Sequence, residues 1–576
     1  MPRFQPIYDI AQLCAQKGIT QAVLCPGSRC APITIAFARH DEITVRTFSD
    51  ERSAAFIASG IAHQTQSPTI LVCTSGSAAF NFAPAIAEAF FQEIPLLVFT
   101  ADRPKEWIDQ LDGQTIRQNN IFGSHVKKTF TVPEDYDHPD AVWFIHRAVN
   151  EAINLAQEFP RGPVHINIPF REPLYPAKDE KIKFNKNVKE IKANAIAGEL
   201  TEGDINELHE RLNRFSKIVI LAGQNDFDDE LAKSVEKFSN SNHAPVVGDI
   251  LSNLHSKQNV IRYADSFLGA CPEDVKASLQ PELLVTFCKS IISKNTKLFL
   301  RKYKPKEHWH IQPNGPAADT FQSLTEIIHC QPKSFFKALN SSKGQKKFES
   351  QKKENFKLIW EAEEHRIVRS MNDHFKNASF SELLIVKEFI SQLPARCNLH
   401  LANSMAVRYA NLIGVEATKK GLHVYANRGA SGIDGCTSTA VGHALSNATP
   451  NFLITGDMAF FYDRNAFWHN YALPNLHVLV LNNHGGIIFN VIDGPGNVAE
   501  LKEFFVTDQK LSARHLCSEL NYDYLHVDSE KKIRNSLKDF LVFDSKTKIL
   551  EFESTQEENK EAYQKFKQKI KEGYGT

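Results

Sequence analysis

Oxygen-bearing side chains follow two neighbouring apolar runs in the last third of the chain. Asp457 comes after the run at 451–455, and Asn483 comes after the run at 477–481. Carboxylate and amide oxygens suit Mg²⁺, which takes few protein ligands and completes its shell with phosphate oxygens and water. The backbone carbonyl of Gly485 is free to approach the same ion, and a helix after Asp457 would aim its N-terminus at a diphosphate. The pattern predicts a magnesium–diphosphate site, the plainer alternative being two ordinary turns.

The pairs Gly456-Asp457 and Asn482-Asn483 resemble the diphosphate signature of thiamine diphosphate (ThDP) enzymes. Met458 is a departure, because a third glycine is usual at that position. The resemblance implies ThDP as the cofactor, together with Mg²⁺ or Mn²⁺. Gly456 would then lie beside the cofactor, and the metal ligands would be Asp457, Asn483 and Gly485.

Glu51 follows a strand expected at 43–48 and precedes a helical stretch at 52–64. ThDP enzymes place a glutamate here, against N1′ of the aminopyrimidine, so that the 4′-nitrogen can take the proton of the thiazolium C2. The resemblance therefore implies that Glu51 is the catalytic residue. Alternatively, Asp50 and Glu51 only cap and charge the first helical turn. The diphosphate motif elsewhere in the chain favours the catalytic role.

Longer runs resemble one branch of these enzymes, the 2-succinyl-5-enolpyruvyl-6-hydroxy-3-cyclohexene-1-carboxylate synthase family. They are PGSR at 26–29, DER at 50–52, TSG at 74–76, TADRP at 100–104, IRQ at 116–118 and NRGASGIDG at 427–435. The similarity covers the first and last thirds well and the middle third thinly. It implies a transferase that decarboxylates 2-oxoglutarate and adds the succinyl carbanion to isochorismate in menaquinone biosynthesis. The alternatives are another 2-oxo acid decarboxylase, an acetolactate-type synthase, or a catalytically silent cofactor-binding protein.

Both substrates carry two carboxylates, so their site needs several arginine or lysine side chains aimed inward. By resemblance, Arg408 and Arg428 would hold the distal carboxylate of the succinyl group. The residues expected to face isochorismate are Ser28, Arg29, Arg103, Gln114, Lys294 and Ser404. Arg117 is a further candidate. For any single arginine the alternative is a solvated charge or a weak surface ion pair.

Cofactor contacts are implied for a further set of residues: Ser75, Gly76, Ile433, Ile488 and Phe489. Ile433 would separate the two rings of ThDP and enforce its bent shape, or else be an ordinary core residue. Ile488 and Phe489, with Ile492, would form an apolar wall that favours loss of the carboxylate charge, or else belong to a helix core.

Three more positions depart from the family pattern. Gly113, Asn295 and His484 stand where relatives often carry asparagine, arginine and asparagine. Asn295 leaves one fewer basic group for isochorismate. We expect His484 to be a supporting or surface residue rather than a metal ligand.

Short apolar strands alternate with helices through most of the chain, which predicts parallel sheets covered by helices. The strands expected are at 22–25, 43–48, 69–74, 95–100, 217–222, 245–247, 283–287, 298–300, 451–455 and 477–481. A helical stretch is expected at 458–471. Ligands of such sheets collect beyond the carboxyl ends of the strands. We predict three doubly wound parallel-sheet α/β domains of the ThDP-binding type.

The expected domains are a pyrimidine-binding domain at 1–180, a central α/β domain at 200–340, a diphosphate-binding domain at 370–555 and a tail at 556–576. Lysine-rich polar segments at 177–200 and 340–357 predict linkers. The tail is expected to form a terminal surface helix at 557–571. The central domain lacks GxGxxG and is not expected to bind a dinucleotide.

Composition points to a soluble enzyme without a nucleic-acid or membrane partner. The 576 residues include 67 Lys+Arg and 67 Asp+Glu, so a basic excess for nucleic acid is missing. The ten cysteines form no CxxC pair or zinc spacing and are expected to be buried free thiols in a reducing compartment. We see no secretory signal and no apolar run near the ~20 residues of a membrane span, and expect a cytoplasmic enzyme. Because Glu51 and the diphosphate motif of ThDP enzymes meet across subunits, the resemblance implies a homodimer or homotetramer.

Overall fold

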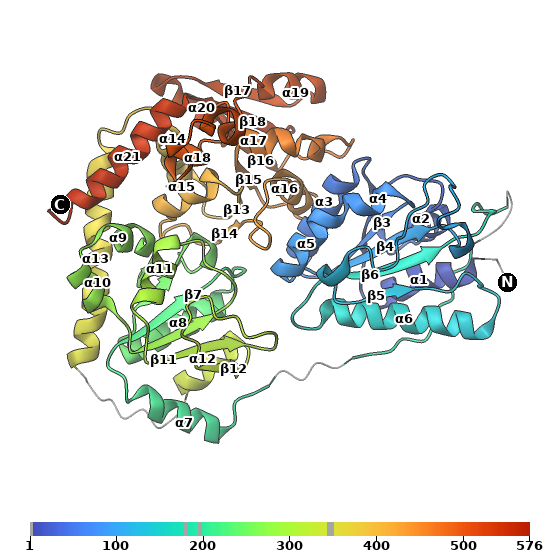
Figure 1. Cartoon of the computed structure of the whole chain (residues 1–576), viewed down its shortest axis with the longest axis horizontal. Helices are drawn as coiled ribbons and strands as arrows, with labels where there is room; N and C mark the ends of the chain where they lie inside the picture. Colours follow the sequence, from blue (N-terminus) through green and yellow to red (C-terminus); the bar gives the residue numbers. More distant parts are fainter. Residues whose placement is uncertain (1–3, 178–181, 194–197, 342–350, 493, 576) are drawn as a thin grey trace.

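The computed structural model describes residues 4–177, 182–193, 198–341, 351–492 and 494–575. Its framework consists of three six-stranded sheets in which every strand pair is parallel. Figure 1 shows the N-terminal sheet on the right, the central sheet at lower left and the C-terminal sheet at the top. The predicted fold class of three parallel-sheet α/β domains is confirmed. Each sheet forms one layer of the molecule together with the helices that cover it.

The N-terminal sheet has the order β2-β1-β3-β4-β6-β5. Its strands are β1 (Gln21–Leu24), β2 (Thr44–Thr47), β3 (Thr69–Cys73), β4 (Leu96–Asp102), β5 (Thr129–Thr131) and β6 (Val164–Pro169). Alternate strand residues enter two different apolar clusters because successive side chains of a strand point to opposite faces. One face is covered by α1 (Gln5–Gln16), α2 (Ala31–Ala38) and α6 (Pro139–Gln157). The other is covered by α3 (Glu51–Thr65) and α5 (Ala83–Gln92), with α4 (Ser77–Asn81) between β3 and α5.

The C-terminal sheet repeats the same order, strand for strand, as β14-β13-β15-β16-β18-β17. Its strands are β13 (Cys397–Leu401), β14 (Leu422–Tyr425), β15 (Asn451–Gly456), β16 (Leu476–Asn482), β17 (Asp523–Val527) and β18 (Lys548–Glu553). In both sheets the winding reverses beside the first strand, between β1 and β3 and between β13 and β15. Ligands of open α/β sheets bind at such reversal points.

The central sheet has the order β9-β8-β7-β10-β11-β12, which is the strand order of Rossmann folds. Its strands are β7 (Ile218–Ala222), β8 (Val246–Gly248), β9 (Val260–Ile261), β10 (Leu283–Phe287), β11 (Glu307–Gln312) and β12 (Glu326–His329). The strand expected at 298–300 is wrong, because these residues belong to α11 (Lys294–Lys302). Phe299 and Leu300 are buried while Leu298 is exposed. The apolar run 298–300 therefore lies at the border of the buried face of a helix and is not a buried strand.

Helices complete the central and C-terminal layers. They are α7 (Glu202–Leu212), α8 (Asp229–Asn242), α9 (Ala264–Ala270), α10 (Glu273–Leu279), α12 (Pro332–Ser341), α13 (Gln351–Phe375), α14 (Glu382–Gln392), α15 (Met405–Ile413), α16 (Cys436–Ser446), α17 (Asp457–Tyr462), α18 (Ile488–Val491), α19 (Ala513–Leu520), α20 (Glu530–Phe540) and α21 (Gln556–Glu572). No helix among the described residues is long and apolar enough to cross a membrane. All ten cysteines are free thiols and nine of them are buried, as expected.

Three local expectations need correction or refinement. The helix expected at 458–471 ends at Tyr462, where the buried carboxylate of Asp463 accepts hydrogen bonds from Ser438 and turns the chain into a 3₁₀ segment. Residues 351–357 of the second expected linker are helical and open α13, whereas 342–350 lie outside the described residues. The tail is helical as expected, but Phe566 and Ile570 are buried, so α21 packs along α13 and is not a free surface helix (Figure 1).

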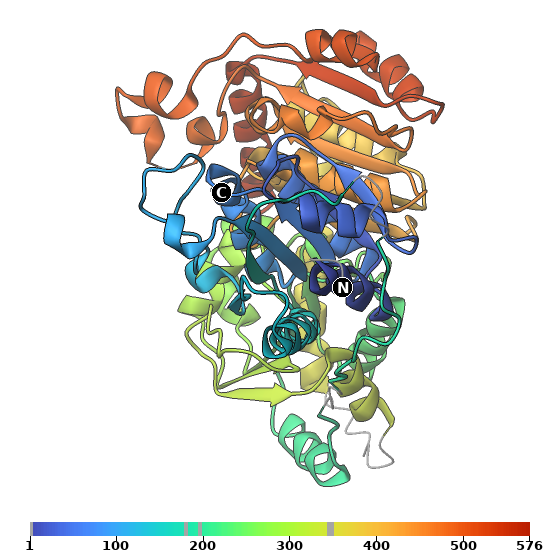
Figure 2. The same cartoon turned by 90° about the vertical axis from the view of Figure 1, so that its right-hand side faces the viewer.

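The N-terminal and C-terminal layers meet where α3 crosses α16. Gly60 and Gly442 face each other there, and a Cβ on Gly442 would lie 2.2 Å from the carbonyl oxygen of Ile57. Glycine on both helices therefore permits backbone contact between layers about 380 residues apart in sequence. In Figure 2 the C-terminal layer (orange) lies above the N-terminal one (blue).

Candidate active site

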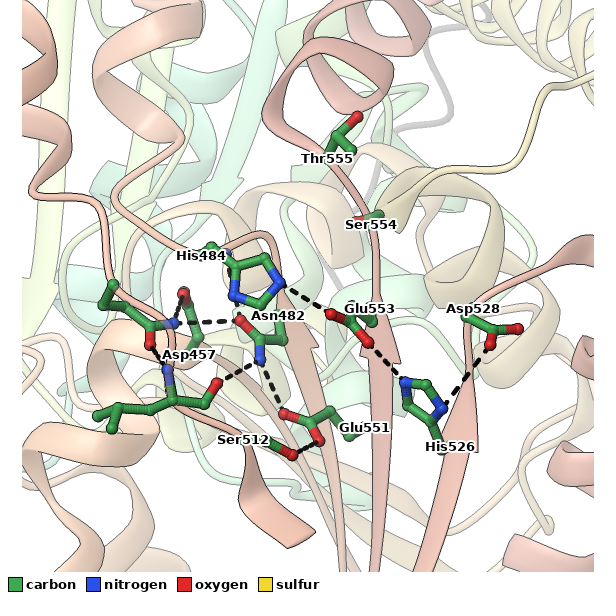
Figure 3. Close-up of polar contacts among 12 residues, drawn as sticks. Asp457, Asn482, His484, Ser512, His526, Asp528, Glu551, Glu553, Ser554 and Thr555 are labelled. Carbon is green, nitrogen blue, oxygen red and sulfur yellow. Dashed lines mark hydrogen bonds and ion pairs between the residues drawn. The ribbon is translucent and has the colours of Figure 1, made fainter.

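Asp457 is the first residue of α17, directly after β15, and its side chain is buried. Its Oδ2 accepts a hydrogen bond of 2.6 Å from Gln509, which also bonds Oδ1 of Asn482 at 3.2 Å. Burial raises the pKa of Asp457 to about 6, although the bond from Gln509 works in the opposite direction. Figure 3 shows this carboxylate beside Asn482 at the ends of adjacent strands. A buried carboxylate with a raised pKa is suited to a cation, which would stabilise its charged form.

Asn483 is oriented by Glu382, the first residue of α14. The amide nitrogen of Asn483 donates a 2.7 Å hydrogen bond to Glu382 Oε1, while Asn483 Oδ1 is buried without a hydrogen-bond partner in the described part of the chain. Such an acceptor is costly unless a ligand satisfies it. Burial raises the pKa of Glu382 to about 7, and the charge of Asp457 acts in the same direction. Asp457 therefore lies within electrostatic reach of the carboxylate that orients Asn483, and both candidate ligands follow adjacent parallel strands, as a shared cation would require.

The remaining geometry also fits a magnesium–diphosphate site. A Cβ on Gly485 would come within 2.9 Å of Val506, so the loop requires glycine there. The described residues contain no cluster of three His, Cys, Asp or Glu side chains that could hold a metal. The candidate ligands Asp457, Asn483 and the carbonyl of Gly485 would be one carboxylate, one amide and one backbone oxygen, a set that leaves positions for phosphate oxygens and would suit Mg²⁺.

The side chain of His484, one of the departures from the family pattern, points toward Glu553 in a chain of histidine and carboxylate side chains (Figure 3). Its Nε2 lies 3.0 Å from Glu553, whose other oxygen lies 2.7 Å from Nε2 of His526. Its backbone φ of +63° is unusual for a non-glycine residue. The sequence patterns gave no sign of this network, because its members lie in the turn after β16 and on β17 and β18.

Glu51 is half-buried at the first turn of α3. Asp50 supplies the cap: its Oδ1 accepts from Ser53 N at 3.2 Å, and its Oδ2 accepts from Asn465 at 2.7 Å. Within the described ranges, the side chain of Glu51 forms no hydrogen bond or ion pair. In particular, no such contact joins it to Asp457 or Asn483. The two acidic residues thus divide the roles, and the carboxylate of Glu51 stays available to a ligand.

Ser75, Gly76 and Gln114 meet at the carboxyl end of β3. Gly76 has a φ of +91°, and its N–H donates a 2.8 Å hydrogen bond to the buried Gln118. A Cβ on Gly76 would lie 3.4 Å from the backbone of Gln114, and the hydroxyl of Ser75 is buried without a partner among the described residues. The exposed Ser28 follows Gly27, whose Cβ would meet Thr74 at 2.3 Å, so the turn after β1 packs on the turn after β3.

Three other predicted basic residues have partners within the chain. Arg29 is buried and bonds the carbonyl of Phe170 at 2.9 Å and the carboxylate of Glu172 at 3.2 Å. Arg103 bonds the carbonyl of Gly113 at 2.9 Å. Arg117 is 80% exposed and pairs with Asp109 at 3.1 Å, which fits the surface alternative. Lys294 lies exposed at the start of α11.

Arg408 and Arg428 are half-buried neighbours at the reversal point of the C-terminal sheet. Arg408 donates to the carbonyl of Ser404 at 2.6 Å, and Arg428 donates to Asn403 Oδ1 at 2.8 Å. Burial lowers the pKa of Arg408, and the charge of Arg428 lowers it further. Neither guanidinium has a carboxylate within ion-pair distance in the described residues. Two adjacent cations without a carboxylate in direct contact are suited to bind one, although the more distant charges of Asp249 and Glu88 also act on Arg428.

Lys297 belongs to the same basic cluster, although the sequence patterns did not single it out as a candidate. Burial lowers its pKa, and the charge of Arg428 is the next cause. It lies one turn after Lys294 on α11 and is half-buried, whereas Lys294 is exposed. Helical periodicity in 294–302 was the signal that could have found it, but the run 298–300 was interpreted as a strand.

The apolar candidates Ile433, Ile488 and Phe489 are partly buried, whereas Ile492 is exposed. Ile433 and Ile488 pack against the core without being enclosed by it. Phe489 contacts Phe505 with ring centroids 5.8 Å apart, and α18 contains no buried residue. Plain helix core therefore does not describe Ile488 and Phe489.

Comparisons with known proteins agree with this geometry. The family model "Thiamine pyrophosphate enzyme, N-terminal TPP binding domain" matches residues 8–123, and "Middle domain of thiamine pyrophosphate" matches 196–401. Relatives named 2-succinyl-5-enolpyruvyl-6-hydroxy-3-cyclohexene-1-carboxylate synthase include that of Cytophaga hutchinsonii, 43% identical over 99% of this chain and 100% of its own. Those of Bacteroides thetaiotaomicron and Flavobacterium johnsoniae are 35% and 37% identical over 98% and 93% of this chain and 99% and 93% of their own. Identity over nearly the whole length shows that the chain belongs to the 2-succinyl-5-enolpyruvyl-6-hydroxy-3-cyclohexene-1-carboxylate synthase family of ThDP enzymes.

Proposed function

We propose that this protein decarboxylates 2-oxoglutarate and adds the succinyl unit to isochorismate, releasing CO₂, as a step of menaquinone biosynthesis. The observation that carries the proposal is the pair Arg408 and Arg428, two half-buried cations without a carboxylate partner in the described chain, at the sheet edge that also holds Asp457. Pyruvate carries only the carboxylate that is lost as CO₂, so a pyruvate decarboxylase would have no distal carboxylate for this pair to bind.

The cofactor site is proposed as follows. Asp457, Asn483 Oδ1 and the carbonyl of Gly485 would hold Mg²⁺ or Mn²⁺, with Gly456 beside the diphosphate. When bound, ThDP supplies the carbon nucleophile that accepts the succinyl unit. Glu51 would hold a proton at N1′ of the aminopyrimidine, and Ile433 would keep the two rings bent together. Ser75 and Gly76 would contact the cofactor from the N-terminal sheet.

Substrate selection would rest on charge. Arg408 and Arg428 would bind the distal carboxylate of 2-oxoglutarate and so fix its keto carbon for attack. Ser28, Arg29, Arg103, Gln114, Lys294 and Ser404 would face isochorismate. Ile488 and Phe489 would exclude water from the reacting carboxylate, whose charge disperses as CO₂ leaves.

We further propose a homodimer, or a dimer of dimers, in which Glu51 of one subunit serves Asp457 of the other. Support comes from the lack of any hydrogen bond or ion pair between the two in the described single chain, and from exposed aromatic side chains. Phe80, Phe91 and Phe504 are 56%, 56% and 68% exposed, and apolar surface of this kind marks interfaces. The free cysteines support a reducing compartment such as the cytoplasm.

The test is loss of isochorismate absorbance on mixing protein with ThDP, Mg²⁺, 2-oxoglutarate and isochorismate, with each component omitted in turn. Consumption that requires all four is the expected result. Intact isochorismate together with release of CO₂ from 2-oxoglutarate or pyruvate would instead favour a simple decarboxylase or an acetolactate-type synthase.

A further inference from the structure

The run 427–435 is held by a side chain from the N-terminal layer. Glu88 on α5 is 3% exposed, and its two carboxylate oxygens accept three backbone hydrogen bonds. The donors are the N–H groups of Gly429 at 2.7 Å, Ala430 at 2.7 Å and Ser431 at 3.0 Å. Successive N–H groups that converge on one anion form a strong, charge-assisted contact. A buried carboxylate thus takes the place of the hydrogen-bond partners that this irregular loop lacks.

The same loop is fitted to α5 by its backbone. A Cβ on Gly429 would lie 2.4 Å from the carbonyl oxygen of Glu88, so only glycine permits this approach. Gln92, one turn further along α5, donates a 2.7 Å hydrogen bond to the carbonyl of Ala426. Gln224, beyond β7 of the central sheet, donates to the same carbonyl at 3.0 Å. All three layers therefore converge on residues 426–431.

This loop carries two of the proposed site residues. Arg428 donates to Asn403 Oδ1 at 2.8 Å, and Asn403 in turn donates to the carbonyls of Asn427 at 2.7 Å and Gly432 at 2.6 Å. Asn403 therefore holds the loop from the C-terminal layer while Glu88 holds it from the N-terminal layer. A shift of the backbone at 429–431 would move Arg428 on one side and Ile433 on the other.

We propose that Glu88 is a positioning residue that sets Arg428, and with it the 2-oxoglutarate carboxylate site, through the backbone of residues 429–431. The inference rests on the proposed function for the identity of the carboxylate. Glu88 touches neither substrate nor cofactor in this scheme. It acts through the loop backbone, and its nearby charge also raises the pKa of Arg428. Three donors require two full acceptor oxygens, which glutamine at this position does not supply because its amide nitrogen would face a backbone N–H.

The test uses full-length Glu88→Gln, with Glu88→Asp as the milder second variant and Glu42→Gln, an exposed acid of the same layer, as control. Hydrogen exchange of the amides at 429–431 is measured on the protein alone, and KM and kcat are measured for 2-oxoglutarate and isochorismate. We expect at least about tenfold faster exchange at 429–431. KM for 2-oxoglutarate should rise on the order of 10- to 100-fold, as a misplaced binding group predicts. KM for isochorismate and the control variant should stay near wild type.

Unchanged exchange at 429–431, or a wild-type KM for 2-oxoglutarate with only kcat or melting temperature reduced, overturns the positioning role. If Glu88→Gln does not fold, the same readouts in Glu88→Asp decide, because the charge remains while its reach shortens by one methylene. If wild-type protein ignores 2-oxoglutarate, the proposed function has failed and the substrate part of the inference falls with it. In that case, faster exchange at 429–431 in the variants would still show that Glu88 holds the loop, so failure of the proposed function remains distinguishable from failure of the positioning role.

Discussion

At the residue scale, the site depends on acids and amides whose neighbours decide their use. Asp50 and Glu51 are adjacent, yet Asp50 caps α3 and bonds Asn465 while Glu51 keeps an unpaired carboxylate within the described structure. Asn483 and Asn482 are also adjacent, but Glu382 orients the first and Gln509 bonds the second. Sequence neighbours thus acquire different roles from partners in other elements.

Glu51→Gln should lower kcat by about 10²- to 10⁴-fold, the range for loss of a proton-transfer group. The affinity for ThDP should change little, because Asp50 still caps the helix. Quenching of tryptophan fluorescence measures this affinity. Asp50→Asn, which preserves a capping side chain, is the matched control and should retain most of the activity. A Glu51→Gln protein with wild-type kcat would remove Glu51 from the mechanism.

The buried His165 on β6 should make the unfolding free energy depend on pH. Burial lowers its pKa from 6.5 to about 3, and its Nε2 lies 2.7 Å from the hydroxyl of Thr100. The folded state therefore holds the neutral ring, so this stabilisation is complete above pH ~6.5 and is lost as pH falls toward the folded pKa. Between pH 7 and 5, wild type should lose about 2 kcal/mol more unfolding free energy than His165→Gln. Urea unfolding at both pH values measures the difference, and parallel losses in the two proteins would contradict it.

At the scale of elements, strand ends and one helix crossing place the site. The repeated order of the N-terminal and C-terminal sheets gives two reversal points. The motifs at 26–29, 74–76 and 456–457, together with the candidate Ser404, follow the strands that flank these points. The crossing of α3 and α16 then fixes one layer against the other through Gly60 and Gly442. Since Glu51 begins α3, this crossing also sets the position of the carboxylate proposed to be catalytic.

Gly442→Ala should destabilise the protein by about 1–3 kcal/mol, because the added methyl would overpack against the backbone of α3. In an exposed helix, replacing glycine by alanine ordinarily stabilises the helix by up to about 1 kcal/mol. A loss of stability in Gly442→Ala would therefore show that α3 and α16 pack tightly where they cross. Gly203→Ala on the exposed helix α7 is the control, since a Cβ there meets only Thr201 Oγ1 at an ordinary 3.6 Å. Denaturant unfolding compares the two, and a stabilised Gly442→Ala variant would argue against a tight crossing.

At the scale of the whole molecule, the prediction concerns assembly. Glu51→Gln and Asp457→Asn should each be inactive as pure proteins. If each site combines Glu51 of one subunit with Asp457 of another, mixing and re-equilibrating the two variants restores one intact site in each mixed dimer. Random mixing then yields about a quarter of wild-type activity. Activity assays of the mixture measure this, with sedimentation to verify exchange; no recovery despite exchange would place both residues in one chain's site.

Local patterns were sufficient for much of the fold. Short apolar strands followed by turns and helices indicated three parallel sheets, and the strands expected at 22–25, 69–74, 217–222 and 283–287 lie within a residue or two of β1, β3, β7 and β10. Parallel strands share one carboxyl edge, so Asp457 and Asn483 could be placed together from sequence alone. The apolar run 298–300 failed because three residues cannot separate a strand from the buried stripe of a helix.

The sequence by itself determined the strand-end motifs and the family, because both are written in short contiguous runs. Only the tertiary structure decided which charges remain unpaired: Arg117 pairs at the surface, whereas Arg408 and Arg428 lie together and Lys297 joins them. It also decided that Glu88 holds Gly429, 341 residues away. Such contacts follow from how helices and loops of different layers pack, and packing between distant segments leaves no periodic trace in either one.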